Sequence, residues 1–139
     1  MKDILAPQKT DAILLAGNAD VKIDIMALNL LDYFEHYEYF PQAYFSRQNI
    51  SIDTFISENI KDNQRIIVNT LPQDSFSELV KDSVFKVLIV FSTADEREYP
   101  IKVYDYIVDA RDISEDVLVQ RIVVAWGCWL DGRKITSPM

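Results

Sequence analysis

The stretch that decides the fold is Phe85–Phe91, which reads Phe-Lys-Val-Leu-Ile-Val-Phe. Its β-branched and aromatic residues are typical of a strand at the centre of a sheet. Shorter apolar runs at Ile13–Ala16 and Ile66–Val68 predict two more buried strands, and turn residues follow each of them. Because continuous apolar runs are typical of parallel strands covered on both faces, the pattern indicates an α/β protein.

Helices are expected between these strands. From Lys22 to Tyr37, apolar side chains recur every three or four residues, which predicts an amphipathic helix. A second helix is expected from Ile52 to Ile60, and a third begins at the capping box that Ser75 forms with Glu78. Acidic residues follow a capping serine in the segment from Ser114 to about Leu130, which predicts the last helix.

Two further strands are expected at Ala43–Phe45 and Tyr104–Val108, and the polar segment Ser92–Pro100 is expected to be a loop. Strands then alternate with helices along most of the chain. This order predicts a three-layer α/β sandwich around a mostly parallel five-stranded sheet. We expect an N-terminal arm (residues 1–10), a single domain (11–131) and a C-terminal tail (132–139).

Composition narrows the class of function. The 139 residues are 49% hydrophobic and 26% charged, and the net charge is −8. An acidic surface repels phosphate backbones, so we expect no nucleic-acid partner. No apolar stretch is long enough for a membrane span, and the N-terminus is too polar for a signal peptide. Cys128 is the only cysteine, which fits a reducing compartment, and a cytoplasmic location is expected.

The chain has only three glycines, Gly17, Gly127 and Gly132. Phosphate-binding loops need glycine-rich turns, and no such loop is present. Gly127 lies inside the predicted last helix, where glycine costs about 1 kcal/mol relative to alanine. Its place between two tryptophans predicts a close helix contact at that point.

Catalytic and metal sites lack parts. His36 is the only histidine, so neither a zinc site nor a Ser-His-Asp or Cys-His arrangement can be assembled. We therefore expect no catalytic residue, no cofactor and no metal. The alternative is a small enzyme, or a ligand binder dependent on nucleotide or Mg²⁺, that uses the carboxyl ends of the strands. Its pocket would contain Asp20, Asn69, Ser92, Thr93 and Asp109.

The last helix is apolar on nearly every side, whereas covering a sheet needs only one apolar stripe. The excess predicts a contact surface for a protein partner or for a second copy of the chain. The residues expected to make this contact are Val119, Ile122, Val123, Trp126, Trp129 and Leu130. The alternative is that the N-terminal arm or the C-terminal tail buries the outer side of this helix.

The strand order and the segment Asp105–Asp112 resemble the receiver domains of two-component signalling, which implies a flavodoxin-like or receiver-like sheet. Active receivers carry an acidic pair after the first strand and a phospho-accepting aspartate after the third. They also carry a serine or threonine after the fourth strand and a lysine after the fifth. In this chain the first site reads Gly17-Asn18-Ala19-Asp20, and Ser92 or Thr93 fits the fourth strand.

Two positions depart from the receiver pattern. Asn69 stands where the acceptor aspartate is expected, and asparagine cannot form an acyl phosphate. Asp109 stands where the lysine is expected, which removes the charge that would hold a phosphate. The resemblance therefore implies a degenerate, non-phosphorylated receiver-like domain. Such domains serve as protein-interaction modules, and their last strand and helix often pair them.

Overall fold

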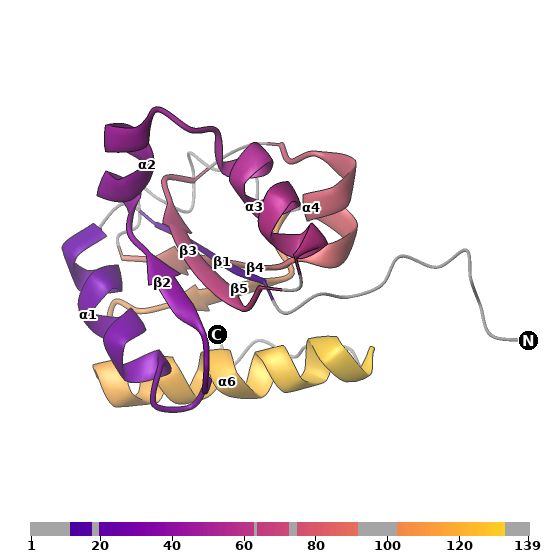
Figure 1. The fold of residues 1–139 in the computed structure, drawn as a ribbon. Helices are drawn as coiled ribbons and strands as arrows, with labels where there is room; N and C mark the ends of the chain where they lie inside the picture. The colour runs from indigo at the N-terminus through magenta and orange to yellow at the C-terminus, as the bar shows by residue number, and fades with distance from the viewer. Residues whose placement is uncertain (1–11, 18–19, 63, 73–74, 92–102, 133–139) are drawn as a thin grey trace, which may run out of the picture.

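The computed structural model describes residues 12–17, 20–62, 64–72, 75–91 and 103–132. The expected arm, the segment 92–100 and the tail from residue 133 lie outside these ranges. Within them, helices flank one five-stranded sheet (Figure 1). The elements in chain order are β1 (Ile13–Ala16), α1 (Asp20–Leu30), β2 (Glu38–Phe40), α2 (Gln42–Gln48), α3 (Ile52–Lys61), β3 (Ile66–Thr70), α4 (Glu78–Ser83), β4 (Phe85–Val90), β5 (Tyr106–Asp109) and α6 (Glu115–Asp131).

All four strand pairings are parallel, and the strands lie side by side in the order β2-β3-β1-β4-β5. The predicted α/β sandwich with a five-stranded parallel sheet is confirmed. Strand β3 lies between β2 and β1 in this sheet. The flavodoxin order 2-1-3-4-5 places the first strand beside the second, so the two sheets differ in the position of the third strand.

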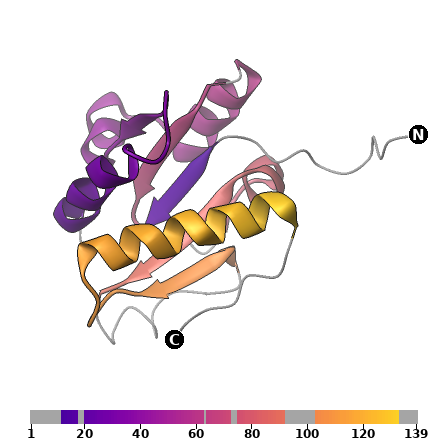
Figure 2. The same ribbon diagram turned by 90° about the horizontal axis from the view of Figure 1, so that it is seen from below.

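Two helical layers cover the sheet. Helices α1 and α6 lie on one face, and α2, α3 and α4 lie on the other (Figures 1 and 2). Alternate residues of β1 and β4 enter two separate cores, one beneath each layer. Every residue of β1, β3 and β4 is buried, which explains why these strands read as unbroken apolar runs.

The second strand is the main correction to the sequence prediction. It is Glu38–Phe40, whereas the predicted strand Ala43–Phe45 lies in α2. Helix α1 ends at Leu30, and His36 then takes a left-handed conformation with φ 67° that reverses the chain. The reversal brings β2 to the edge of the sheet beside β3. Pro41, which has no N–H to donate, ends this edge strand.

Serine caps begin three of the helices. Ser51 and Ser114 accept backbone N–H groups at the starts of α3 and α6, so the predicted cap at Ser114 is confirmed. The cap of α4 is Ser77, whose hydroxyl accepts the N–H of Val80 at 3.3 Å. The prediction placed this cap at Ser75. Both Ser75 and Ser77 precede Glu78, and the sequence pattern of a capping box does not distinguish such nearby helix starts.

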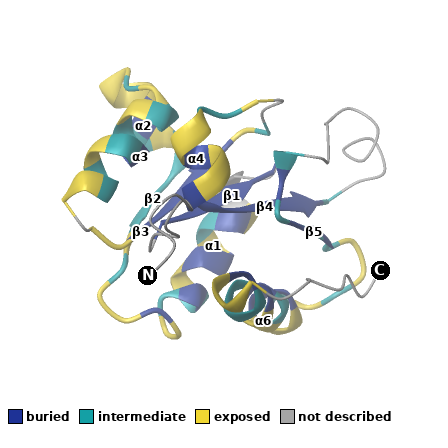
Figure 3. Cartoon of the chain, turned by 90° about the vertical axis from the view of Figure 1, so that its right-hand side faces the viewer, coloured by how far each residue is buried: buried dark blue, intermediate teal, exposed yellow. Residues whose placement is uncertain are grey.

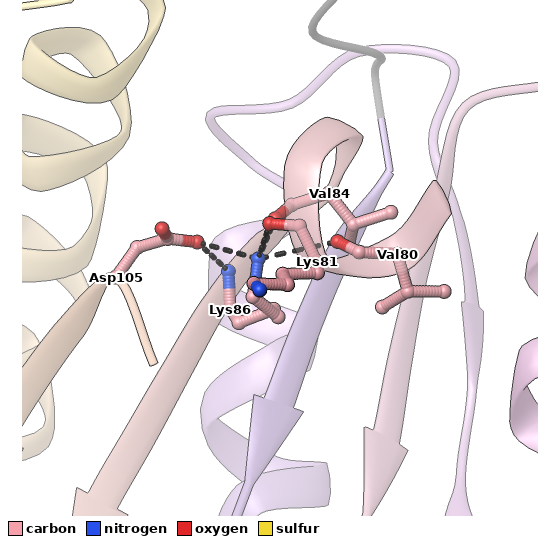
Figure 4. A network of polar contacts seen from close by, with 5 residues as sticks. All are labelled: Val80, Lys81, Val84, Lys86 and Asp105. Atoms are coloured by element: carbon pink, nitrogen blue, oxygen red, sulfur yellow. Dashed lines mark hydrogen bonds and ion pairs between the residues drawn. The ribbon is translucent and has the colours of Figure 1, made fainter. Parts of the chain in front are cut away.

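Lys86 is a charged residue at the centre of the sheet. Its side chain is 2% exposed and points toward the layer of α2, α3 and α4. The ammonium donates to the carbonyl oxygens of Val80 at 3.2 Å, Lys81 at 2.7 Å and Val84 at 2.8 Å, and it lies 3.1 Å from the Asp105 carboxylate (Figure 4). The lysine therefore caps the carboxyl end of α4 from within the sheet.

This arrangement satisfies the charge of Lys86. Three carbonyl dipoles and one carboxylate replace the water that burial removes, so the ammonium has the partners that a buried charge requires. Asp105 also accepts the backbone N–H of Lys86 at 2.8 Å, which ties the residue before β5 to β4. Burial lowers the pKa of Lys86 below its ordinary 10.5, while Asp105 acts in the opposite direction.

Gly17 and Gly127 differ in what surrounds them. A Cβ on Gly17 would lie 2.8 Å from the Ile23 Cδ1 and 3.2 Å from the carbonyl oxygen of Ile89. A side chain at position 17 would therefore have to displace the end of Ile23 in α1 and shift the end of β4 slightly. A Cβ on Gly127 would meet nothing within 4 Å. The predicted close helix contact at Gly127 is wrong for the described residues, because this glycine faces open space.

No helix within the described ranges combines the length and the apolar character that crossing a bilayer would need.

Replacing Lys86 by methionine should lower the free energy of unfolding by about 2–4 kcal/mol, because two buried carbonyls, one part-buried carbonyl and Asp105 lose their partner. The deficit should grow as pH rises between the lowered pKa of folded Lys86 and 10.5. In that window the unfolded wild type binds more protons than the folded wild type, which stabilises the wild type as pH rises. Urea denaturation at several pH values measures both effects. Lys81→Met, at an exposed position, is the control, and a deficit that shrinks with pH would contradict this account.

Replacing Gly127 by alanine should raise the free energy of unfolding by about 0.5–1 kcal/mol, since the added methyl group meets no atom and alanine favours helix. Gly132 is the matched control. It ends α6 in the left-handed region with φ 73°, so Gly132→Ala should cost about 1 kcal/mol. Urea denaturation of both variants measures the difference. A destabilised Gly127→Ala would show that residue 127 has a packing role.

Candidate functional site

The carboxyl edge of the sheet holds a network of polar side chains centred on Asn69. Asn69 lies in β3 and is fully buried. Its amide nitrogen donates to the Tyr39 hydroxyl at 3.1 Å and to the Asp24 carboxylate at 3.5 Å. Its amide oxygen accepts from Gln42 at 3.1 Å, and the Tyr39 hydroxyl donates to Asp24.

The network joins four segments that are distant in sequence. Asp24 comes from α1, Tyr39 from β2 and Gln42 from the start of α2. Gln42 also donates to the carbonyl oxygen of Gly17, just after β1, at 3.3 Å. Sequence reasoning singled out Asn69 but missed Tyr39 and Gln42, because it placed the second strand too late in the chain.

A pocket of about 260 Å³ opens beside this network. Gln42, Ser46, Asn69 and Thr70 provide its polar lining, and none of them carries a charge. Phe45, Ile52 and Leu71 complete the walls. A pocket of this kind suits a small uncharged ligand that hydrogen-bonds to amides and hydroxyls.

Of the other predicted pocket residues, the described part of the chain places the side chain of only Asp109, and it lies away from Asn69. Asp109 ends β5, and β1 and β4 lie between it and β3. Three strand spacings of about 4.8 Å separate the two residues by roughly 14 Å across the sheet. Asp20 begins α1, but its side chain is outside the described set, and Ser92 and Thr93 lie outside the described ranges.

Asp109 has a partner of its own. Arg111 donates to it through Nε at 2.8 Å and through Nη2, and the backbone N–H of Arg111 adds a bond of 3.0 Å. These contacts lower the pKa of Asp109 to about 2. The carboxylate therefore holds the guanidinium in place at the end of β5.

The residues predicted for an interface on α6 fall into three groups. Val119, Ile122 and Trp129 are buried in the core of the chain itself. Trp129 packs against Phe85 with ring centroids 5.4 Å apart. Val123 and Trp126 are half-buried, and Trp126 makes an edge-to-face contact with Phe34 at 4.9 Å. Leu130, the last of the six, is exposed.

Other apolar side chains occupy the outer surface of the same layer. The structure shows exposed Ile25, Leu28 and Tyr33 on α1 and the turn after it, and exposed Val117, Val124 and Leu130 on α6. We call this set the α1–α6 face. It holds six of the eight exposed large hydrophobic residues in the described ranges. Figure 3 shows that burial on α6 decreases from the side against the sheet to the outer side.

The sequence did contain a signal for the α6 part of this face. Val117 and Val124 lie within the apolar run that predicted a contact surface, although neither was named. The α1 part had a weaker signal, because Ile25 and Leu28 lie beside the apolar stripe of a helix, where single exposed apolar residues are ordinary.

No group of three or more histidine, cysteine, aspartate or glutamate side chains in the described residues could hold a metal ion. A scan against protein-family models finds no match to the chain, and a search of curated proteins finds no significant relative. The candidate sites are therefore argued from their geometry alone.

Replacing Asn69 by aspartate should lower the free energy of unfolding by about 1–3 kcal/mol at neutral pH, because it places a second carboxylate beside Asp24 and removes a donor. Acidification should reduce this loss by protonating a carboxylate of the pair. Adding Asp24→Asn gives the pair a single carboxylate and a single amide again, as in the wild type, and should recover much of the stability. Denaturant titrations at neutral and acidic pH measure these effects, and an equal loss with and without Asp24→Asn would count against the network.

Proposed function

We propose that this chain is a non-catalytic protein-interaction domain that docks its partner on the α1–α6 face. The observation that carries the proposal is the concentration of exposed apolar side chains on that face. Leu28 is 63% exposed and Val124 66%, and both lie on helices that pack together over the same face of the sheet. Exposed apolar side chains gathered on one helical layer are typical of a protein contact site.

The energetics favour a role in association. Leu28 and Val124 make little contact with the chain's own core, so they contribute little to folding. Each fully buried aliphatic side chain gains about 1.5–3 kcal/mol relative to an exposed one, and a docked partner would supply that gain. Half-buried Trp126 lies on α6, like Val124, and offers a large aromatic side chain at the rim of the contact.

The polar groups of the carboxyl edge support a non-catalytic role. Asn69, Tyr39 and Asp24 bond to one another, so their hydrogen-bonding capacity is used within the fold. His36 lies in an exposed turn and Cys128 is half-buried in α6, so they belong to different elements. Nothing in this arrangement provides a nucleophile with an adjacent base.

We further propose that the domain has a regulatory role. This role is suggested by the resemblance to receiver domains. In such a domain, the Asn69 and Asp109 of this chain would prevent phosphorylation. A domain of that kind would act through binding alone, and its state would be set by the partner that occupies the α1–α6 face.

A second candidate function is the binding of a small uncharged ligand in the 260 Å³ pocket beside Asn69. The observation in its favour is the neutral polar lining that four residues provide. Leu71 lies at the rim of that pocket, where it is 59% exposed. It belongs to neither helix of the α1–α6 face, so its substitution distinguishes the two candidate functions.

Replacing Leu28 and Val124 together by aspartate should reduce capture of the partner from a lysate of the native host by at least about tenfold. Both side chains are more than half exposed, so the free energy of unfolding should stay within about 1 kcal/mol of the wild type. Tagged wild type and variant, compared by quantitative mass spectrometry, provide the measurement. Light scattering shows whether the partner is a second copy of the chain.

The control is Leu71→Asp, which changes an exposed leucine outside the α1–α6 face and should leave capture unchanged. Capture that survives the double substitution but fails in Leu71→Asp would contradict the proposed face and indicate a protein contact around Leu71. Trp129→Asp is unsuitable for this test, because Trp129 is 9% exposed and its loss would disrupt the core.

A further inference from the structure

A second pocket, of about 310 Å³, opens between the amino-terminal halves of α1 and α6. The ends of β4 and β5 form its floor, through Phe91 and Ala110. Met26 from α1 and Leu118 from α6 provide apolar walls. None of these side chains was assigned a role by the sequence or by the proposed protein contact.

Three charged residues line the same pocket, and they differ in their partners. The Arg111 guanidinium is held by Asp109, and the Glu115 carboxylate accepts from the Asn29 amide. The Lys22 ammonium lies 5.5 Å from the centre of the Phe91 ring, and no carboxylate of the described residues pairs with it. Lys22 is therefore the cation of this lining that has no ion pair with a described carboxylate, while Glu115 on the α6 side keeps its negative charge beside the Asn29 amide.

We propose that this pocket binds a small amphipathic carboxylate. The apolar tail of the ligand would lie against exposed Ile25 and half-buried Ile113 and Phe91, where it replaces water on apolar surface. Its carboxylate would bond to the Lys22 ammonium, which a cationic ligand with the same tail could not do. A volume of about 310 Å³ is at the lower end of the range for small-molecule pockets, which suits a medium-chain acid.

The pocket shares Ile25 with the α1–α6 face, but its other lining residues are not members of that face. Lys22 is exposed, so its substitution tests binding without loss of the fold. Lys61, an exposed lysine in the last turn of α3 on the other face of the sheet, is the matched control.

The test is a titration of the ¹⁵N-labelled full chain with octanoate, and separately with octylamine, followed by amide chemical shifts. Octanoate should shift the amides of Phe91, Ala110 and Leu118, and octylamine should not. Lys22→Gln should weaken the octanoate Kd by about tenfold, whereas Lys61→Gln should leave it unchanged.

Three results would overturn the proposal. The first is the absence of octanoate shifts at millimolar concentration. The second is equal binding of octylamine and octanoate, which would show that the charge of Lys22 does not select the ligand. The third is a set of shifts outside the pocket, or a Kd that Lys22→Gln does not change, either of which would show binding elsewhere.

Discussion

The buried ammonium of Lys86 is the contact on which much of the architecture depends. It bonds to the carboxyl end of α4 and to Asp105, which leads into β5, from an interior strand of the sheet. Strand β4 is therefore tied to α4 on one side and to the β5–α6 unit on the other. Strand β5 in turn leads into α6, and α6 packs against α1. The α1–α6 face and the pocket between these helices both depend on that connection.

The class of fold could be predicted because the strands that decide it are buried on both faces. Phe85–Phe91, Ile66–Val68 and Ile13–Ala16 have few alternatives once no polar face is visible. The edge strand was missed for the opposite reason. Glu38–Phe40 is short and partly exposed, and its position depends on a left-handed His36 that no pattern in one sequence reveals. Tertiary pairing with β3 decides that strand.

The candidate sites were predictable only in part. The apolar run of α6 predicted a helix with apolar residues on its outer side, and Val117, Val124 and Leu130 are exposed there. Periodicity could not show which side of the helix faces the core. Val119, Ile122 and Trp129 point inward, while Val124 points outward. Gly127 was interpreted as a contact, yet it faces open space. Asn69 was found because it follows an apolar strand, whereas Asp24, Tyr39 and Gln42 reach it only through strand order and the loop after α1.

The α1–α6 layer and the sheet edge beside β3 differ in the kind of surface that they present. Polar groups that hydrogen-bond to one another occupy the edge beside β3, and exposed apolar side chains lie on the outer sides of α1 and α6. Side-chain footprinting of the chain, alone and within the complex captured from its native host, tests the proposed contact on the α1–α6 face most directly. The account predicts that labelling of Leu28 and Val124 falls on binding while labelling of Leu71 and Leu79 does not. Protection of Leu71 or Leu79, with Leu28 and Val124 still labelled, would contradict it.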